Sequence, residues 1–321
     1  MGTNSIIPES IQAPVDSATD MSIAQITYRG WPESYLLSNG IVEVIVVPAI
    51  GRVMQLRLAG DSAGTLWENH ELDGKVHHAA TDEWLNYGGD KCWPAPQSTW
   101  QQHRDRAWPP PSGFDPATMH AVVAGGALEL SSTIDSSWGI QVVRRIELQA
   151  SQPVLRVQTE YRKLHGSPVK VAIWTITQMQ EPERVCMLLD PQSKLAGNYV
   201  HLLAPEPAEL RIQGTVLSFA RHHRAYTKIG SDGSSLAWIG ASCAVRIDVD
   251  PMPGNYTDGG CHTEIYTNPD PLPYVELETL GPLTHMSVGD RIQHSATYTV
   301  TRRSTRDLLD EAQNAFLRVS R

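Results

Sequence analysis

The stretch from Asn255 to Leu283 reads NYTDGGCHTEIYTNPDPLPYVELETLGPL. It predicts two β-strands joined by a proline-rich loop over residues 268–273, because polar and apolar side chains alternate on both sides of that loop. Side chains two positions apart share one face of a strand, so Glu276 and Glu278 are expected to point the same way. If the strands pair as an antiparallel hairpin, Glu264 lies opposite one or other of them.

Three acidic side chains on one strand face need a physical explanation. Directly opposed side chains on paired strands are roughly 4.5–5.5 Å apart between Cβ atoms, and like charges that close are destabilising unless a cation, a ligand or a proton intervenes. With Tyr266 and Tyr274 beside them, the three glutamates are therefore a candidate polar binding site. The alternative is an outer sheet face that simply meets water, as charged strand faces commonly do.

Apolar runs rich in β-branched residues recur along the rest of the chain, with turn signals between them. Almost no helical periodicity separates these runs, which predicts an all-β sandwich rather than alternating strands and helices. No composition break or repeat divides the chain, so we expect one domain over residues 21–321 after a loose arm at 1–20. The expected strands are 41–47, 53–58, 128–134, 140–148, 154–161, 169–177, 216–220, 236–239, 244–249, 263–267, 275–280 and 291–301.

The C-terminus is the exception to this strand pattern. Ser304, Thr305, Arg306 and Asp307 fit a capping box, and apolar residues follow at helical spacing. The sequence therefore predicts a C-terminal helix over residues 305–319 that lies on the sandwich.

Composition limits the partners. The chain has 321 residues, 41% of them hydrophobic, and a net charge of −9, which argues against nucleic acid or an anionic membrane as a partner. It has no apolar run of transmembrane length and no recognisable export signal, so we expect a soluble, cytoplasmic protein. Its four cysteines are widely spaced and form no zinc-ligand pattern; we expect neither a metal nor another cofactor.

Residues 70–120 have little strand pattern but many aromatic side chains. A loop this long in a compact domain is commonly functional, and exposed tryptophans beside hydrogen-bonding groups suit a sugar ring. The alternative is that the tryptophans close the open end of the sandwich. The aromatic and histidine residues of this segment include His77, His78, Trp84, Tyr87, Trp93, Trp100, His103 and Trp108.

Three runs resemble a family of galactose-mutarotase-like proteins: IGRVMQLRL at 50–58, NYGGDKCWPAPQ at 86–97, and YTDGG, EIYTN and YVELETLGPL between 256 and 283. The resemblance spans roughly residues 30–301. It implies the β-supersandwich of aldose epimerases, which is two large antiparallel sheets with a sugar site on a concave face.

The resemblance also implies a catalytic base. Aldose epimerases open and close the ring of a sugar: a carboxylate takes the proton of the anomeric hydroxyl while a histidine protonates the ring oxygen. Their glutamate lies in a hydrophobic-x-Leu-Glu context on a late strand, which Glu278 matches. Their histidines are not matched, because Tyr87 precedes Gly88-Gly89 and Gln178 lies nearest the second histidine's place.

Another residue would then have to be the acid. Lys91 is the first candidate, since a desolvated lysine can exchange protons near neutrality, and His222 or His223 is the alternative. Glu276 or Glu264 would hold sugar hydroxyls or raise the pKa of Glu278. Asp90 would pair with Lys91 or bind hydroxyls, and Asp258 either faces the site or forms an Asp-Gly turn. The candidate substrate-binding residues are Asn86, Tyr87, Asp90, Trp93, Gln97, Gln178, Asp258, Glu264 and Tyr266.

Three functions remain open. The first is a sugar epimerase or mutarotase with Glu278 as base, Glu276 assisting it and Lys91 as acid. The second is a non-catalytic carbohydrate-binding protein. The third is a glycoside hydrolase or lyase, which needs two carboxyl groups about 5–5.5 Å or about 6.5–9.5 Å apart across a cleft. All three require that acids of the late hairpin and indoles of the early loop line one hollow.

Overall fold

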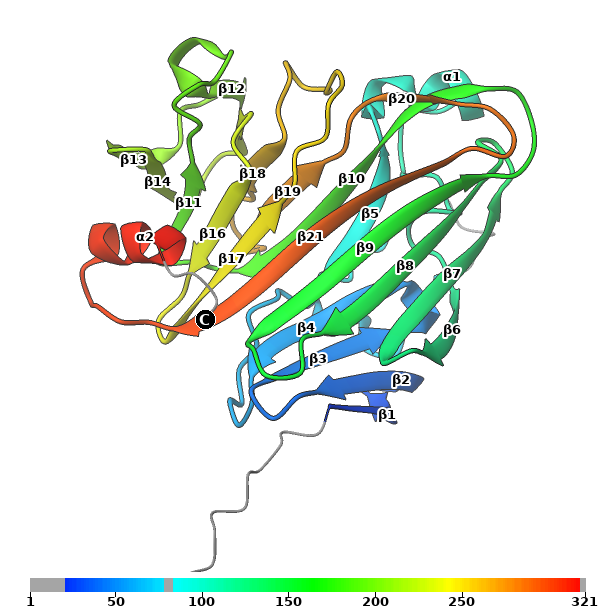
Figure 1. Ribbon diagram of the computed structural model, residues 1–321, viewed down its shortest axis with the longest axis horizontal. Coiled ribbons are helices and arrows are strands. Elements are labelled where there is room, and N and C mark those ends of the chain that lie inside the picture. Colours follow the sequence, from blue (N-terminus) through cyan, green and yellow to red (C-terminus); the bar gives the residue numbers. More distant parts are fainter. Residues whose placement is uncertain (1–20, 78–82, 318–321) are drawn as a thin grey trace, which may run out of the picture.

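The computed structural model describes residues 21–77 and 83–317 and forms two large antiparallel sheets (Figure 1). The first sheet has eleven strands among these residues, and its eleventh, β20 (Thr284–Met286), pairs with β10 at the side. The other ten follow in the order β1 (Ser22–Tyr28), β2 (Trp31–Ser38), β3 (Val42–Val47), β4 (Arg52–Leu58), β5 (Asp90–Ala95), β10 (Val169–Gln180), β19 (Tyr274–Leu280), β18 (Thr263–Thr267), β15 (Thr227–Ser231) and β12 (Val200–Leu203).

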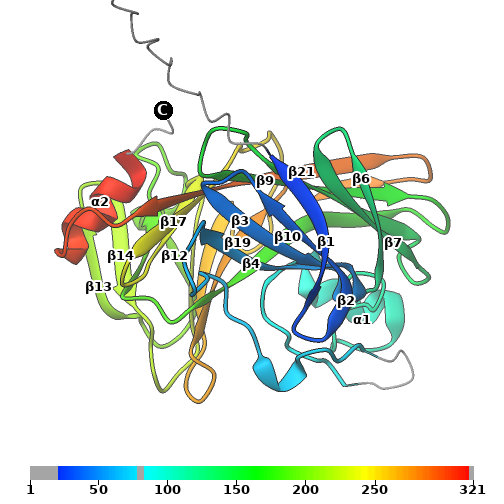
Figure 2. The ribbon, with the colours of Figure 1, turned by 90° about the horizontal axis from the view of Figure 1, so that it is seen from below.

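The second sheet has ten strands in the described part of the chain, and Figure 2 shows the two layers from below. One core cluster contains side chains from both layers, such as Val171 and Leu277 from the first and Val142 and Val245 from the second. The all-β prediction is therefore confirmed. The order is β13 (Ala208–Gln213), β14 (Val216–Ala220), β11 (Arg184–Leu188), β16 (Ser235–Ile239), β17 (Cys243–Val249), β21 (Arg291–Arg302), β9 (Val154–Lys163), β8 (Ile140–Leu148), β7 (Ala127–Asp135) and β6 (Met119–Ala124).

The late hairpin forms as expected. Strands β18 and β19 pair antiparallel, with Glu264 directly opposite Glu278 and Tyr266 directly opposite Glu276. On the other side of β19, the register with β10 places Gln178 opposite Glu276. One face of these strands packs into the core, so the glutamates share the opposite, outer face of the first sheet.

Strand β5 was not expected, because it lies inside the segment predicted to be a loop. All six of its residues, DKCWPA, are buried, so the apolar–polar alternation that marks a strand with one wet face is absent. Asp90 points into the space between the sheets, where it forms an ion pair with Arg144 of β8 and accepts hydrogen bonds from Thr177 and Tyr298. Its neighbour Lys91 therefore projects from the outer face.

The C-terminal helix α2 (Leu308–Leu317) begins three residues later than expected, and residues 318 and 319 lie outside the described part. Asp307 is the capping residue, since its Oδ1 accepts the backbone N–H groups of Leu309 and Asp310, both at 2.9 Å. Ala312 and Ala315 pack on the second sheet in a small apolar cluster. The only other α-helix described is α1 (Trp100–Arg104).

Two further sequence predictions concern the N-terminal arm and membrane-spanning segments. The predicted arm at 1–20 lies outside the described residues. Within the described residues, no helix is both long and apolar enough to cross a membrane.

The Asp90–Arg144 pair joins the two sheets through the core, and its side chains are at most 2% exposed. We expect Asp90→Asn to lower the free energy of unfolding by about 3–5 kcal/mol, because the arginine charge stays buried without its partner. Chemical denaturation at pH 7 measures this. Asp61→Asn removes the surface pair with Arg302, whose side chain is 57% exposed, and should leave the curve nearly unchanged. Equal losses in the two variants would contradict the assignment.

Candidate functional site

The outer face of the first sheet carries a group of charged side chains from neighbouring strands. All of them are at least 85% buried, which is uncommon for ionised groups unless they are paired. We call this group the carboxylate cluster; it consists of Lys91 from β5, Glu276 and Glu278 from β19, Glu264 from β18 and Lys228 from β15.

Lys228 bridges the two directly opposed carboxylates. Its Nζ lies 2.5 Å from Glu264 Oε2 and 2.9 Å from Glu278 Oε2. The glutamate side chains are 0% and 1% exposed, and the lysine is 15% exposed. One cation thus lies between two carboxylates, which leaves an uncompensated negative charge unless a proton is also bound.

The pKa values follow from this arrangement. Burial raises the pKa of Glu278 to about 7, with Lys228 opposing the rise and Glu264 adding to it. Burial also raises the pKa of Glu264. Burial lowers the pKa of Lys228, but the two carboxylates outweigh burial and the net pKa is raised. Lys228 is therefore a permanent cation, and Glu278 can exchange a proton near neutral pH.

A second ionic pair lies beside the first. Lys91 Nζ is 3.5 Å from Glu276 Oε1, which also accepts a hydrogen bond from Gln178 Nε2 at 2.9 Å. Burial lowers the pKa of Lys91, an effect that Glu276 opposes and Arg52 reinforces. Burial likewise raises the pKa of Glu276. Burial thus makes Lys91 a stronger acid than an ordinary lysine.

The sheet register sets the spacing between Glu278 and Lys91. Ile176 of β10 is paired with Lys91 on one side and with Glu278 on the other. Because neighbouring strands are about 4.8 Å apart, the two residues lie about 10 Å apart at the backbone, with long side chains reaching over Ile176. Glu276 and Lys228, at 14% and 15% exposure, are the cluster members nearest to solvent.

A group of indoles continues the cluster towards β5. Trp174 Nε1 donates to Glu278 Oε2 at 2.6 Å, and its ring meets that of Trp93 edge to face at 5.3 Å. Both ammonium groups lie near indole rings: Lys91 is 5.2 Å from the Trp93 centroid and Lys228 is 4.9 Å from that of Trp174. Glu278 and Trp93 are therefore on one face, linked by Trp174.

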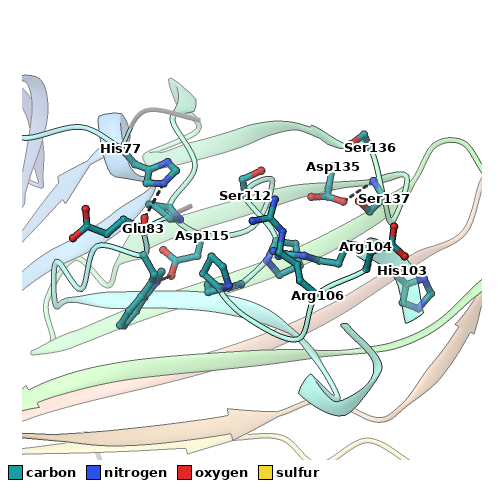
Figure 3. Close-up of a pocket in the computed structure, with 16 residues that line it drawn as sticks. His77, Glu83, His103, Arg104, Arg106, Ser112, Asp115, Asp135, Ser136 and Ser137 are labelled. Carbon is teal, nitrogen blue, oxygen red and sulfur yellow. Dashed lines mark hydrogen bonds between the residues drawn. The ribbon is translucent and has the colours of Figure 1, made fainter. Parts of the chain in front are cut away.

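Asp115 anchors the far side of these indoles. Its Oδ2 accepts hydrogen bonds from Trp93 at 2.8 Å and Trp84 at 3.2 Å, and its Oδ1 binds Arg52 at 2.5 Å. A cavity of about 440 Å³ lies beyond, lined in part by Trp84 and Asp115 (Figure 3). No residue of the carboxylate cluster lines this cavity, so the cavity is not the single hollow expected for the hairpin acids and the early-loop indoles.

Three predicted site residues lie apart from the cluster. Asp90 faces the core with Arg144, on the side of β5 opposite to Lys91. Tyr87 is fully buried in a separate apolar group and meets Trp31 edge to face at 6.1 Å. Gln97 is exposed in the 3₁₀ turn that follows β5. These positions suit structural support better than direct contact with a ligand.

Other predicted residues border the cluster. Tyr266 is half-buried beside Tyr274, and Asn86 lies within hydrogen-bond reach of Tyr274. Asp258 occupies a turn at φ +50°, accepts a hydrogen bond from Thr257, and contributes to the raised pKa of Glu264. Asp258 therefore lies in the expected turn, and its position towards the site stays a prediction.

The alternative acid histidines are located elsewhere. His222 Nδ1 accepts the backbone N–H of Ala225 in a turn at 2.9 Å. His223 is 63% exposed and lies against Arg221, which also binds Glu181. Neither histidine contacts the carboxylate cluster through any of these bonds, which leaves Lys91 as the candidate acid.

Sequence reasoning missed Lys228, Trp174, Asp115 and Arg52 as site residues. Lys228 is a lone lysine in the short strand TKIGS, and only its pairing beside β18 reveals its role. The one available signal was the need for a cation between Glu264 and its partner.

Neither a family model nor a curated protein matches the chain. Several solved structures match the chain in fold. A candidate aldose 1-epimerase from Escherichia coli K12 matches at a TM-score of 0.53 and 13% identity, over 88% of this chain and 100% of the other. A galactose mutarotase-like protein from Lactobacillus casei matches at 0.55 and 9%, over 84% and 100%. A candidate aldose 1-epimerase from Klebsiella pneumoniae matches at 0.57 and 8%, over 92% and 86%.

Identities this low establish the fold rather than the activity. The matches agree with the two-sheet architecture. The chain therefore has the fold of the galactose-mutarotase-like proteins, which it resembles in structure along most of its length.

Proposed function

We propose that the protein binds a carbohydrate over the carboxylate cluster and interconverts its anomers, with Glu278 as general base. The observation that carries the proposal is the buried pair of carboxylates, Glu264 and Glu278, bridged by Lys228, where burial raises the pKa of Glu278 to about 7. A base is most effective when its pKa lies near the working pH. The names of the structural neighbours, aldose 1-epimerase and galactose mutarotase-like protein, support the same chemistry.

The reaction needs one base and one acid. Glu278 takes the proton of the anomeric hydroxyl, the bond between the anomeric carbon and the ring oxygen breaks, and Lys91 gives its proton to that oxygen. Rotation in the open-chain aldehyde and reversal of both proton transfers close the ring with the other configuration. Glu278 and Lys91 lie on opposite sides of Ile176. The base and the acid can therefore contact two different atoms of one sugar ring.

The remaining residues have supporting roles in this proposal. Lys228 and Glu264 set the pKa of Glu278, and Glu276 holds Lys91 in place. Hydroxyl and ring contacts fall to the polar and aromatic side chains that border the cluster: Asn86, Trp93, Trp174, Gln178, Asp258 and Tyr266.

A binding protein without catalysis is the second candidate. Glu278 and Lys91 are each only 1% exposed, and both already have partners, which favours a site that binds sugars and performs no proton transfer. A hydrolase is less well supported. A single ammonium group bridges Glu264 and Glu278, which leaves no cleft between those carboxylates for a glycosidic oxygen.

Glu278→Gln separates the two leading candidates. We expect anomer exchange to slow by about 10²–10⁴-fold, the usual contribution of general acid–base catalysis, while sugar binding persists. Exchange NMR on a panel of aldoses measures the rate. Glu147→Gln on β8 removes an exposed carboxylate and is the matched control. If wild-type protein accelerates no aldose, the catalytic proposal fails and the binding function remains.

The pH profile tests the two proton-transfer roles. Glu278 must be ionised to accept a proton, so kcat/KM should fall as the pH drops below about 7. Lys91 must be protonated to donate, so kcat/KM should also fall as the pH rises through its lowered pKa, below the ordinary value of 10.5. Lys91→Met should remove the alkaline limb. A flat wild-type profile between pH 5 and 8 would count against Glu278 as the base.

A further inference from the structure

Trp108 is 46% exposed, whereas Trp93 and Trp100 of the same array are buried and Trp84 is half-buried. Its ring stacks over Trp100 at 6.3 Å and meets Trp84 edge to face at 5.2 Å and Trp93 at 5.8 Å. These neighbours fix the ring from one side. An indole that is held rigidly and still open to solvent offers a flat apolar surface to a ligand.

A cavity lies next to this array of indoles. Pro109, Pro110 and Pro111 follow Trp108 in the chain and line the cavity, together with Trp84. Its volume of about 440 Å³ lies within the range of about 300–1,000 Å³ that small-molecule sites occupy. Figure 3 shows its charged and hydroxyl side chains arranged around the space, with Ser112 at the rim.

A series of three indoles connects the cavity to the carboxylate cluster. Trp84 lines the cavity and meets Trp93, which meets Trp174, whose indole N–H binds Glu278. Asp115 also lines the cavity while holding the indole N–H groups of Trp84 and Trp93. A ligand that extends from the cluster along these indoles would therefore reach Trp108 and the cavity.

The charges of the cavity favour a neutral ligand over an anionic one. Asp115 is bound by Arg52, and Asp135 accepts the backbone N–H groups of Gly113 at 3.2 Å and Ser137 at 2.9 Å. The lining carries the carboxylates of Glu83, Asp105, Asp115 and Asp135 and the guanidinium groups of Arg104 and Arg106. With Arg52 bound to Asp115, one negative charge is left over, which disfavours an anionic ligand. A mixed set of donors and acceptors beside an indole suits the hydroxyls and the apolar face of a sugar ring.

We propose that Trp108, Trp84 and the adjoining cavity bind a second sugar ring, so that the protein acts on the reducing end of a neutral di- or oligosaccharide. The inference rests on the proposed function for the position of the first ring, over the carboxylate cluster. The second ring stacks on the open face of Trp108, and its hydroxyls meet the polar lining of the cavity.

Calorimetric titration with matched sugars tests this, with maltose, cellobiose and lactose measured against glucose, and mannobiose against mannose. We expect at least one disaccharide to bind about tenfold more tightly than its reducing-end monosaccharide, a free-energy difference of about 1.4 kcal/mol. Trp108→Ala should abolish that difference and leave the monosaccharide affinity unchanged. Trp108→Phe, which keeps a flat ring, should retain part of it.

A steric variant tests the cavity separately. Ser112 is exposed at the rim, so Ser112→Trp should fill the space and weaken only disaccharide binding. Ser287→Trp, at an exposed serine outside the cavity lining, is the matched control. Equal affinity for every disaccharide and its monosaccharide would overturn the inference, as would a Trp108→Ala loss shared equally by both.

The two proposals fail in different ways. If the disaccharide preference is present but no anomer exchange occurs, the second subsite stands and the catalytic function falls. If anomer exchange occurs and depends on Glu278 without any disaccharide preference, the catalytic function stands and the second subsite falls. Thermal melting of each variant verifies that it is folded before its affinity is interpreted.

Discussion

The site depends on one electrostatic constraint: two glutamates are directly opposed on paired, buried strands. Glu264 and Glu278 cannot both be ionised at that distance without a cation, and Lys228 from the next strand supplies it. The single ammonium group of Lys228 compensates the charge of one carboxylate. Burial disfavours the charged form of the other carboxylate and so raises its pKa. The raised pKa of Glu278 is thus a consequence of strand register and burial together.

Strand β5 is held in place by contacts on the face opposite to the candidate site. Asp90 and Lys91 are neighbours in sequence, yet alternation sends Asp90 into the core and Lys91 to the outer face. The core ion pair with Arg144 fastens β5 to the second sheet. The strand that carries the candidate acid is therefore held by a buried bond on its reverse face, which restricts where Lys91 can lie.

The tryptophans connect this chemistry to the surface. Trp174 binds Glu278 directly, Trp93 and Trp84 are fixed by Asp115, and Trp108 is the part of the array that remains open. The early loop and the late hairpin, about 170 residues apart in the chain, therefore contribute to one connected set of side chains. Closing the sandwich and presenting aromatic rings are compatible roles, because inner indoles pack while the outer one faces solvent.

The sequence by itself determined the all-β class, the hairpin of β18 and β19, and the shared face of Glu264, Glu276 and Glu278, because a period of two is a local property of a strand. It could not reveal β5, whose two buried faces erase that period, or the separation of Asp90 from Lys91. Lys228, Trp174 and Asp115 became site residues only in the tertiary structure. Their roles arise from pairing between strands and loops distant in the chain, and neither residue type nor local spacing encodes such partners.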